Sequence, residues 1–133
     1  MTETTLGTMG RWGCFSSNPR VEFLDDGRRV RVCETFTYQR ASGQIFTVPQ
    51  GFTCDGASIP RILWPLSGGP FEGRHRDAAL VHDVLYAEGM TGTPIVDRAT
   101  ADRIFYEAQR CCGVPWVNAV AKYLAVRCFG PRW

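Results

Sequence analysis

The sequence predicts an α+β fold in which a small N-terminal antiparallel β-hairpin or meander packs on a core of three helices. Two patterns support this prediction. Apolar and polar side chains alternate between residues 19 and 48, whereas apolar residues recur at helical spacing in three stretches between residues 73 and 130. With 133 residues and 44% hydrophobic composition, the chain has room for one core, so residues 1–133 are expected to form a single domain.

The first part of the chain is expected to be a scaffold. Residues 1–18 are rich in Thr, Gly and Ser and predict an extended N-terminal arm. In the β region, residues 19–48, Asp26-Gly27 and Ser42-Gly43 supply tight turns. The period of two predicts about three antiparallel strands. The alternating apolar residues are Val21, Phe23, Val30, Val32, Phe36 and Tyr38.

Residues 49–72 read as one long loop punctuated by prolines and glycines. A loop of this length in a compact domain usually has a function. Within it, Asp55 is followed by Gly56, which permits a turn in which a carboxylate and backbone carbonyls converge on one point. An ordinary Asx-turn is the alternative interpretation.

Three helices are expected after this loop. The first is predicted over residues 73–88, the second from an Asp97 N-cap to Cys112, and the third from Pro115 to Gly130. The second helix carries apolar residues at the i, i+3, i+4, i+7, i+11 spacing of a buried face.

Composition argues against several classes of protein. A net charge of +2 and scattered arginines argue against a nucleic-acid partner. No apolar run approaches the roughly 20 residues of a membrane helix, and the N-terminus lacks the features of a signal peptide. The six cysteines fit no zinc pattern; reduced thiols are expected at synthesis, and disulfides stay open for a protein that works outside a cell.

A polar trio, His82, Asp83 and Tyr86, lies in an otherwise apolar run of the first predicted helix. In a helix, His82 and Tyr86 share a face, and Asp83 points about a quarter-turn away. Polar groups in such surroundings must be hydrogen-bonded or take part in chemistry. A core histidine beside a solvated aspartate is the simpler alternative.

The second predicted helix can complete a catalytic arrangement. Two antiparallel helices joined by residues 89–96 would bring Asp102 to His82. The aspartate would then fix the imidazole tautomer and leave the other nitrogen as a base. Asp83 and Asp55, with loop carbonyls, would form a hard-oxygen site that suits Ca²⁺. The predicted chemistry is metal-assisted ester hydrolysis by water that His82 activates.

These residues carry a resemblance to a known family. His-Asp-x-x-Tyr on one helix followed by Ala-Asp-x-x-Phe on the next resembles the core of secreted phospholipases A2, most closely the small bacterial and fungal branch. The resemblance implies a phospholipid or membrane surface as the partner. It also implies a role for each matching residue: His82 as base, Asp102 orienting it, Tyr86 supporting the pair, and Asp55, Asp83 and the Gly56 carbonyl as calcium ligands.

The chain departs from the phospholipase pattern in three ways. The glycine-rich calcium loop of the animal enzymes is absent, which leaves Asp55-Gly56 to do its work. Ala78 and Ala79 stand where a cysteine usually ties the first helix near the catalytic histidine. The N-terminal residues also lack the pattern expected of a signal peptide.

A second resemblance covers roughly residues 45–130. The motifs Val-Pro-x-Gly-Phe, Asp-Gly-Ala-Ser-Ile-Pro, His-Asp-x-Leu-Tyr and Ala-Asp-x-x-Phe are similar to an uncharacterised family of bacteria and their phages. This resemblance implies an origin in bacteria or their phages and no activity. The expected location is a phage virion or the host cytoplasm. A virion structural protein of the tail or baseplate, with other virion proteins as partners, is therefore the alternative to a phage-encoded phospholipase A2-like enzyme.

Two other hydrolase classes do not fit the sequence. An HD-type phosphohydrolase needs several histidine ligands, and the chain has only His75 and His82. A zinc deaminase needs H-x-E and P-C-x-x-C motifs, which the sequence lacks.

Overall fold

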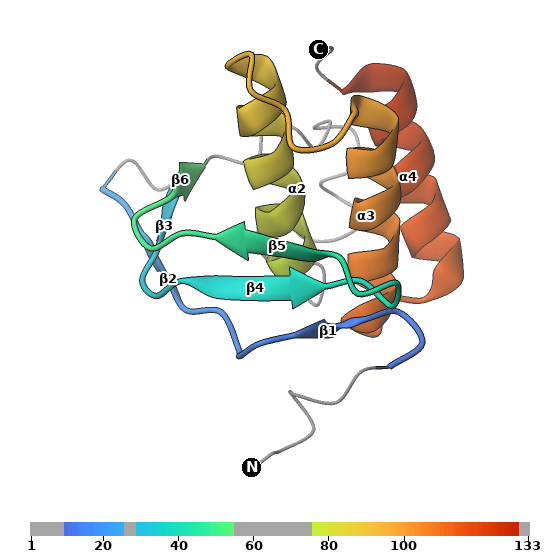
Figure 1. Ribbon diagram of the computed structural model, residues 1–133, viewed down its shortest axis with the longest axis horizontal. Helices are drawn as coiled ribbons and strands as arrows, with labels where there is room; N and C mark the ends of the chain where they lie inside the picture. The colour runs from blue at the N-terminus through green and yellow to red at the C-terminus, as the bar shows by residue number, and fades with distance from the viewer. Residues whose placement is uncertain (1–9, 26–28, 55–75, 131–133) are drawn as a thin grey trace.

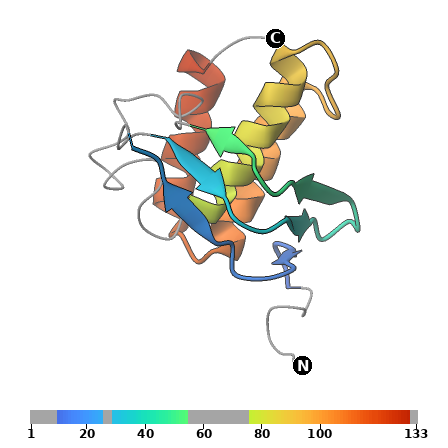
Figure 2. The same ribbon diagram turned by 90° about the vertical axis from the view of Figure 1, so that its left-hand side faces the viewer.

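The computed structural model describes residues 10–25, 29–54 and 76–130. Over these residues, small antiparallel sheets come first in the chain and three packed helices follow, as Figure 1 shows. The α+β prediction is therefore confirmed. Figure 2 gives the view from the side, in which some strands lie in front of the helices and others lie to their right.

The first described sheet has the strand order β1-β4-β5. It consists of β1 (Cys14–Phe15), β4 (Phe36–Gln39) and β5 (Ile45–Val48). A turn joins β4 to β5, and Gly43 takes a φ of 102° there, which side chains other than glycine rarely adopt. The turn predicted at Ser42-Gly43 thus sets the register in which Tyr38 pairs with Phe46.

The second described sheet has the order β2-β3-β6. Its strands are β2 (Val21–Phe23), β3 (Val30–Val32) and β6 (Thr53–Cys54). The predicted alternation is clearest in β3, where Val30 and Val32 are buried and Arg31 is exposed.

The strands differ from the prediction in number and grouping. The prediction was about three strands in one hairpin or meander, whereas the described residues form two sheets. Strand β1 lies inside the predicted N-terminal arm, and β6 lies inside the predicted long loop. Both additional strands are two residues long. A two-residue strand has no periodicity to detect, and it exists only because a partner strand from elsewhere in the chain pairs with it.

The helices are α2 (Arg76–Met90), α3 (Arg98–Cys111) and α4 (Trp116–Phe129). Asp97 is the N-cap of α3 as predicted, because its side chain accepts a hydrogen bond from the Thr100 amide at 3.3 Å. The end of α2 differs slightly. The helix continues through Gly89, and Gly92 instead takes the positive φ of the following turn. The start predicted at residues 73–75 lies outside the described residues.

Helix α2 lies at the centre of the core. Its residues from Ala78 to Tyr86 are all buried, and it contacts both α3 and β5. In Figure 1, β4 and β5 cross in front of α2, the turn between them lies in front of α3, and α4 lies beyond α3. This central position explains why the polar trio on α2 is buried instead of solvated. Over the described residues, no helix has the length and apolar character needed to cross a membrane.

Candidate functional site

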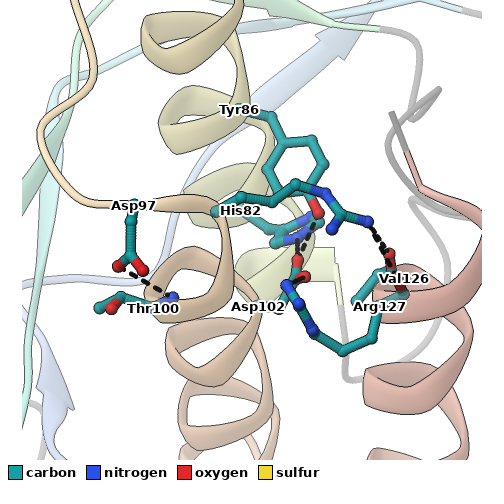
Figure 3. A network of polar contacts seen from close by, with 8 residues as sticks. His82, Tyr86, Asp97, Thr100, Asp102, Val126 and Arg127 are labelled. Atoms are coloured by element: carbon teal, nitrogen blue, oxygen red, sulfur yellow. Dashed lines mark hydrogen bonds and ion pairs between the residues drawn. The ribbon is translucent and has the colours of Figure 1, made fainter. Parts of the chain in front are cut away.

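The site is built around one contact between α2 and α3. The Nε2 atom of His82 lies 2.8 Å from Oδ1 of Asp102, and both side chains are completely buried. Figure 3 shows the two side chains meeting between the helices. The structure thus brings together the two residues whose pairing the antiparallel arrangement predicts.

Tyr86 contacts the same carboxylate oxygen from one turn further along α2. Its hydroxyl donates to Oδ1 of Asp102 at 2.5 Å, and its ring centroid lies 4.2 Å from that of His82. The ring of Phe105, on α3, lies 4.6 Å from the imidazole. The i, i+4 spacing of His82 and Tyr86 is what lets both reach one acceptor.

Two arginines complete the network, and the sequence patterns did not identify them. Arg127, in the last turn of α4, donates from Nη1 to Oδ2 of Asp102 at 2.9 Å. Arg98, in the first turn of α3, donates from Nη2 to the carbonyls of Val126 and Arg127, each at 3.0 Å. A basic residue in the last turn of a helix is already favoured by the helix dipole. The position of Arg127 in the sequence therefore did not indicate that it contacts Asp102.

The electrostatics favour a neutral imidazole beside an ionised carboxylate. Burial lowers the pKa of His82, although the hydrogen bond with Asp102 opposes this shift. Burial alone would raise the pKa of Asp102, but hydrogen bonds from His82, Tyr86 and Arg127 together hold it below its usual value. Burial and the contact with Asp102 raise the pKa of Tyr86, so its hydroxyl keeps its proton.

The charge state determines the imidazole tautomer. An ionised carboxylate can only accept hydrogen bonds, so Nε2 of His82 carries the hydrogen that Asp102 accepts. In this tautomer Nδ1 is the basic nitrogen. The arrangement can therefore provide a neutral base whose orientation is fixed by the carboxylate.

The predicted calcium ligands are only partly described. Asp83 is buried, with 6% of its surface exposed, and it adjoins His82 on α2. Its carboxylate is a hard-oxygen ligand of the type that Ca²⁺ prefers. Asp55 and Gly56 lie outside the described residues. Within the described ranges, no three His, Cys, Asp or Glu side chains come together as a metal site, so a calcium site stays a prediction that depends on the segment with Asp55.

Several of the cysteines are free thiols: Cys14, Cys33, Cys111, Cys112 and Cys128. Most of them are half-buried, and Cys128 is exposed. Burial raises the pKa of Cys111 to about 11 and that of Cys112 to about 12. Both thiols therefore stay protonated near neutral pH, which makes them poor nucleophiles.

Comparison with known proteins identifies relatives of unknown function. A family described as "Protein of unknown function (DUF1353)" matches residues 30–126. An uncharacterized protein of Sinorhizobium fredii, y4jT, is 37% identical over 124 residues, which cover 92% of this chain and 35% of the relative. A second one from the same strain, y4iH, is 37% identical over 121 residues, covering 90% of this chain and 48% of the relative.

The chain therefore spans between about a third and a half of the length of these relatives. No solved structure matches the chain. The matches agree with the resemblance to an uncharacterised family, while the resemblance to phospholipases A2 stays a prediction.

Proposed function

The chain belongs to the DUF1353 family, and for this member we propose calcium-dependent hydrolysis of phospholipid esters by a His82–Asp102 dyad. One observation carries the proposal. A single buried carboxylate oxygen, Oδ1 of Asp102, accepts from both Nε2 of His82 and the hydroxyl of Tyr86. Three of the residues that carry the resemblance to phospholipases A2 form this contact: His82, Tyr86 and Asp102.

The proposed reaction uses Nδ1 of His82 as a general base. Nδ1 takes a proton from a water molecule as the water oxygen attacks the ester carbonyl carbon. Asp102 then stabilises the imidazolium that forms. When the tetrahedral intermediate collapses, the proton on Nδ1 passes to the leaving alkoxide, which yields a free fatty acid and a lysophospholipid.

A bound calcium ion would polarise the ester carbonyl and offset the negative charge that develops on its oxygen. Asp83 would hold this ion together with Asp55 and the Gly56 carbonyl. Asp83 contributes to the proposal because its buried carboxylate adjoins His82 on the same helix.

The first test is fatty-acid release from mixed phospholipid vesicles, with calcium and with a chelator. We expect release that needs calcium and that falls by about 100-fold or more in His82→Ala, because that variant removes the base. His75→Ala is the matched control, since it makes the same substitution at the other histidine in the chain. Circular dichroism should show that both variants are folded. If the wild type releases no fatty acid under any lipid or thiol condition, the enzymatic proposal is wrong.

A structural role in a phage virion, in the tail or baseplate, is the second candidate. The observation that favours it is the complete burial of His82 and Asp102, because buried and mutually hydrogen-bonded polar groups also serve as structural networks. In that case His82→Ala would reduce the stability of the protein, and the wild type would show no hydrolysis to lose.

A further inference from the structure

A tight turn at residues 10–13 displays an arginine and a tryptophan. Two backbone hydrogen bonds close the turn, from the Gly10 amide to the Gly13 carbonyl at 3.3 Å and from the Gly13 amide to the Gly10 carbonyl at 3.2 Å. Gly13 takes a φ of 94°, and a side chain at this position would collide with the backbone of β4. Arg11 and Trp12 occupy the two central positions of the turn.

The ring of Trp12 is held in a fixed position. The Trp12 carbonyl accepts a hydrogen bond from the hydroxyl of Tyr38, a fully buried residue of β4. The indole packs edge-on against Tyr106 of α3, with ring centroids 5.7 Å apart. Cys111 donates from Sγ to the Gly13 carbonyl at 3.4 Å, so the turn is attached to the C-terminal end of α3 (Figure 1).

Two guanidinium groups lie beside this ring. The Cζ atom of Arg11 is 5.3 Å from the Trp12 ring centroid, and that of Arg110, on α3, is 5.5 Å from it. Both are cation–π distances. Arg110 is held further by a hydrogen bond from Nη1 to the Val114 carbonyl at 3.1 Å. Arg11 is exposed, so its side chain can adjust to a ligand.

Neither guanidinium has an ion-pair partner among the described residues. Glu107 lies one turn before Arg110, but its carboxylate is already paired with Arg40 and Arg103. The Nε atom of Arg110 is shielded from solvent and has no hydrogen-bond partner. An unsatisfied buried donor costs free energy, and two like charges beside one ring repel each other. A bound anion would reduce both costs.

We propose that Arg11 and Arg110 form a binding site for a phosphate group. Guanidinium groups bind phosphate through paired N–H donors, and stacking on Trp12 occupies only their faces. A phosphate dianion has enough charge and enough oxygens to accept from both arginines at once, which a carboxylate does not. Two sources offer this chemistry: a soluble phosphate compound and a lipid headgroup.

The phosphate site is separate from the dyad. Arg110 comes eight residues after Asp102 on α3, which is about 12 Å along the helix axis. The inference therefore goes beyond the proposed function, and phosphate binding is expected whether or not the protein hydrolyses lipids.

The test is a titration of the full chain with inorganic phosphate, at constant ionic strength and without divalent cations. The readout is the indole signals in ¹H–¹⁵N spectra, where a Trp12→Phe variant identifies the signal of Trp12. We expect this signal to shift saturably, with half-saturation at about 1 mM or below. Acetate at the same ionic strength should not produce the shift.

Arg11→Gln and Arg110→Gln should each weaken phosphate binding by about 10-fold, because each removes one of the two charged donors. Arg31→Gln is the matched control, since it removes the same charge from an exposed position of β3, in the other sheet. Its effect should stay within about twofold. Arg11 lies on an exposed turn, so its variant tests the proposal even if Arg110→Gln does not fold.

Three results would overturn the proposal. The first is the absence of a saturable shift of the Trp12 signal in the wild type. The second is wild-type affinity for phosphate in Arg11→Gln. The third is an equal response to acetate, or equal weakening by Arg31→Gln, because the protein would then respond only to net charge.

Co-sedimentation with vesicles distinguishes the two sources of phosphate. One set of vesicles is phosphatidylcholine alone, and the other also contains phosphatidic acid, whose headgroup is a phosphate monoester. Binding to the second set that Arg11→Gln weakens would assign the site to a lipid headgroup. Binding of inorganic phosphate without such vesicle binding would assign it to a soluble phosphate compound.

Discussion

Lys122 is the only lysine in the sequence, and it is buried on α4 with 3% of its surface exposed. The described part of the chain supplies no carboxylate partner for its ammonium group. Burial therefore lowers the pKa of Lys122 below its usual value of 10.5. The ammonium group is more easily formed in the unfolded chain than in the folded protein.

This difference makes stability depend on pH in a defined direction. Between the lowered pKa of Lys122 in the folded protein and 10.5, the unfolded chain binds more protons than the folded protein does. The contribution of Lys122 to the free energy of unfolding therefore rises with pH over this range. We expect Lys122→Met to stabilise the protein near neutral pH by about 1 kcal/mol or more. The advantage over the wild type should shrink as the pH approaches 10.5.

Urea unfolding at a series of pH values measures this effect. Asn118→Met, at an exposed position of the same helix, is the control, and its effect should not vary with pH. If the difference between Lys122→Met and the wild type is the same at all pH values, then the lysine is not held in a desolvated position.

At the scale of elements, one ion pair joins the sheet to the helices. Arg40 follows β4, and its Nε and Nη2 atoms lie 2.8 Å and 2.9 Å from the two carboxylate oxygens of Glu107 on α3. Only 20% and 14% of these side chains are exposed. A two-pronged contact with limited solvent access is stronger than a typical surface pair.

We expect Glu107→Gln to lower the free energy of unfolding by about 1–3 kcal/mol, because it removes a charged partner from a mostly buried guanidinium. Glu22→Gln is the comparison. Glu22 pairs with Arg31 at 2.9 Å, but about half of each side chain is exposed, so its loss should cost no more than about 1 kcal/mol. Denaturant titration measures both, and equal losses would show that burial does not distinguish the two pairs.

At the scale of the whole molecule, strands of both sheets and all described helices share one hydrophobic cluster. Phe46 of β5 lies inside it with 3% of its surface exposed, while its neighbour Ile45 is 58% exposed. A shared core predicts that sheets and helices unfold together as one domain.

Phe46→Ala should therefore lower the free energy of unfolding by about 3–5 kcal/mol. The midpoints seen by far-UV circular dichroism and by tryptophan fluorescence should shift together. Ile45→Ala, next to it on the solvent side of β5, should have a much smaller effect. Separate midpoints for the two probes would contradict a single cooperative core.

The helices and the contact between His82 and Asp102 were predictable because their signals are local. The Asp97 cap and the i, i+4 spacing of His82 and Tyr86 each involve residues within one turn of helix. The meeting of His82 and Asp102 needed only one further assumption, that consecutive helices joined by a short connection are antiparallel. Strands β1 and β6 were not predictable, since each forms through pairing with a strand distant in the sequence.

Local sequence patterns were enough to predict the α+β class, the turns and caps, and the candidate residues His82, Tyr86 and Asp102, because each depends on the periodicity or conformational preference of neighbouring residues. The three-dimensional structure was needed to show that His82 and Asp102 are fully buried, that Tyr86 donates to the same carboxylate oxygen and that Arg127 pairs with the other one. These features depend on how three helices pack. The energy of a buried charge is decided by the groups that packing brings around it, and sequence spacing does not encode those groups.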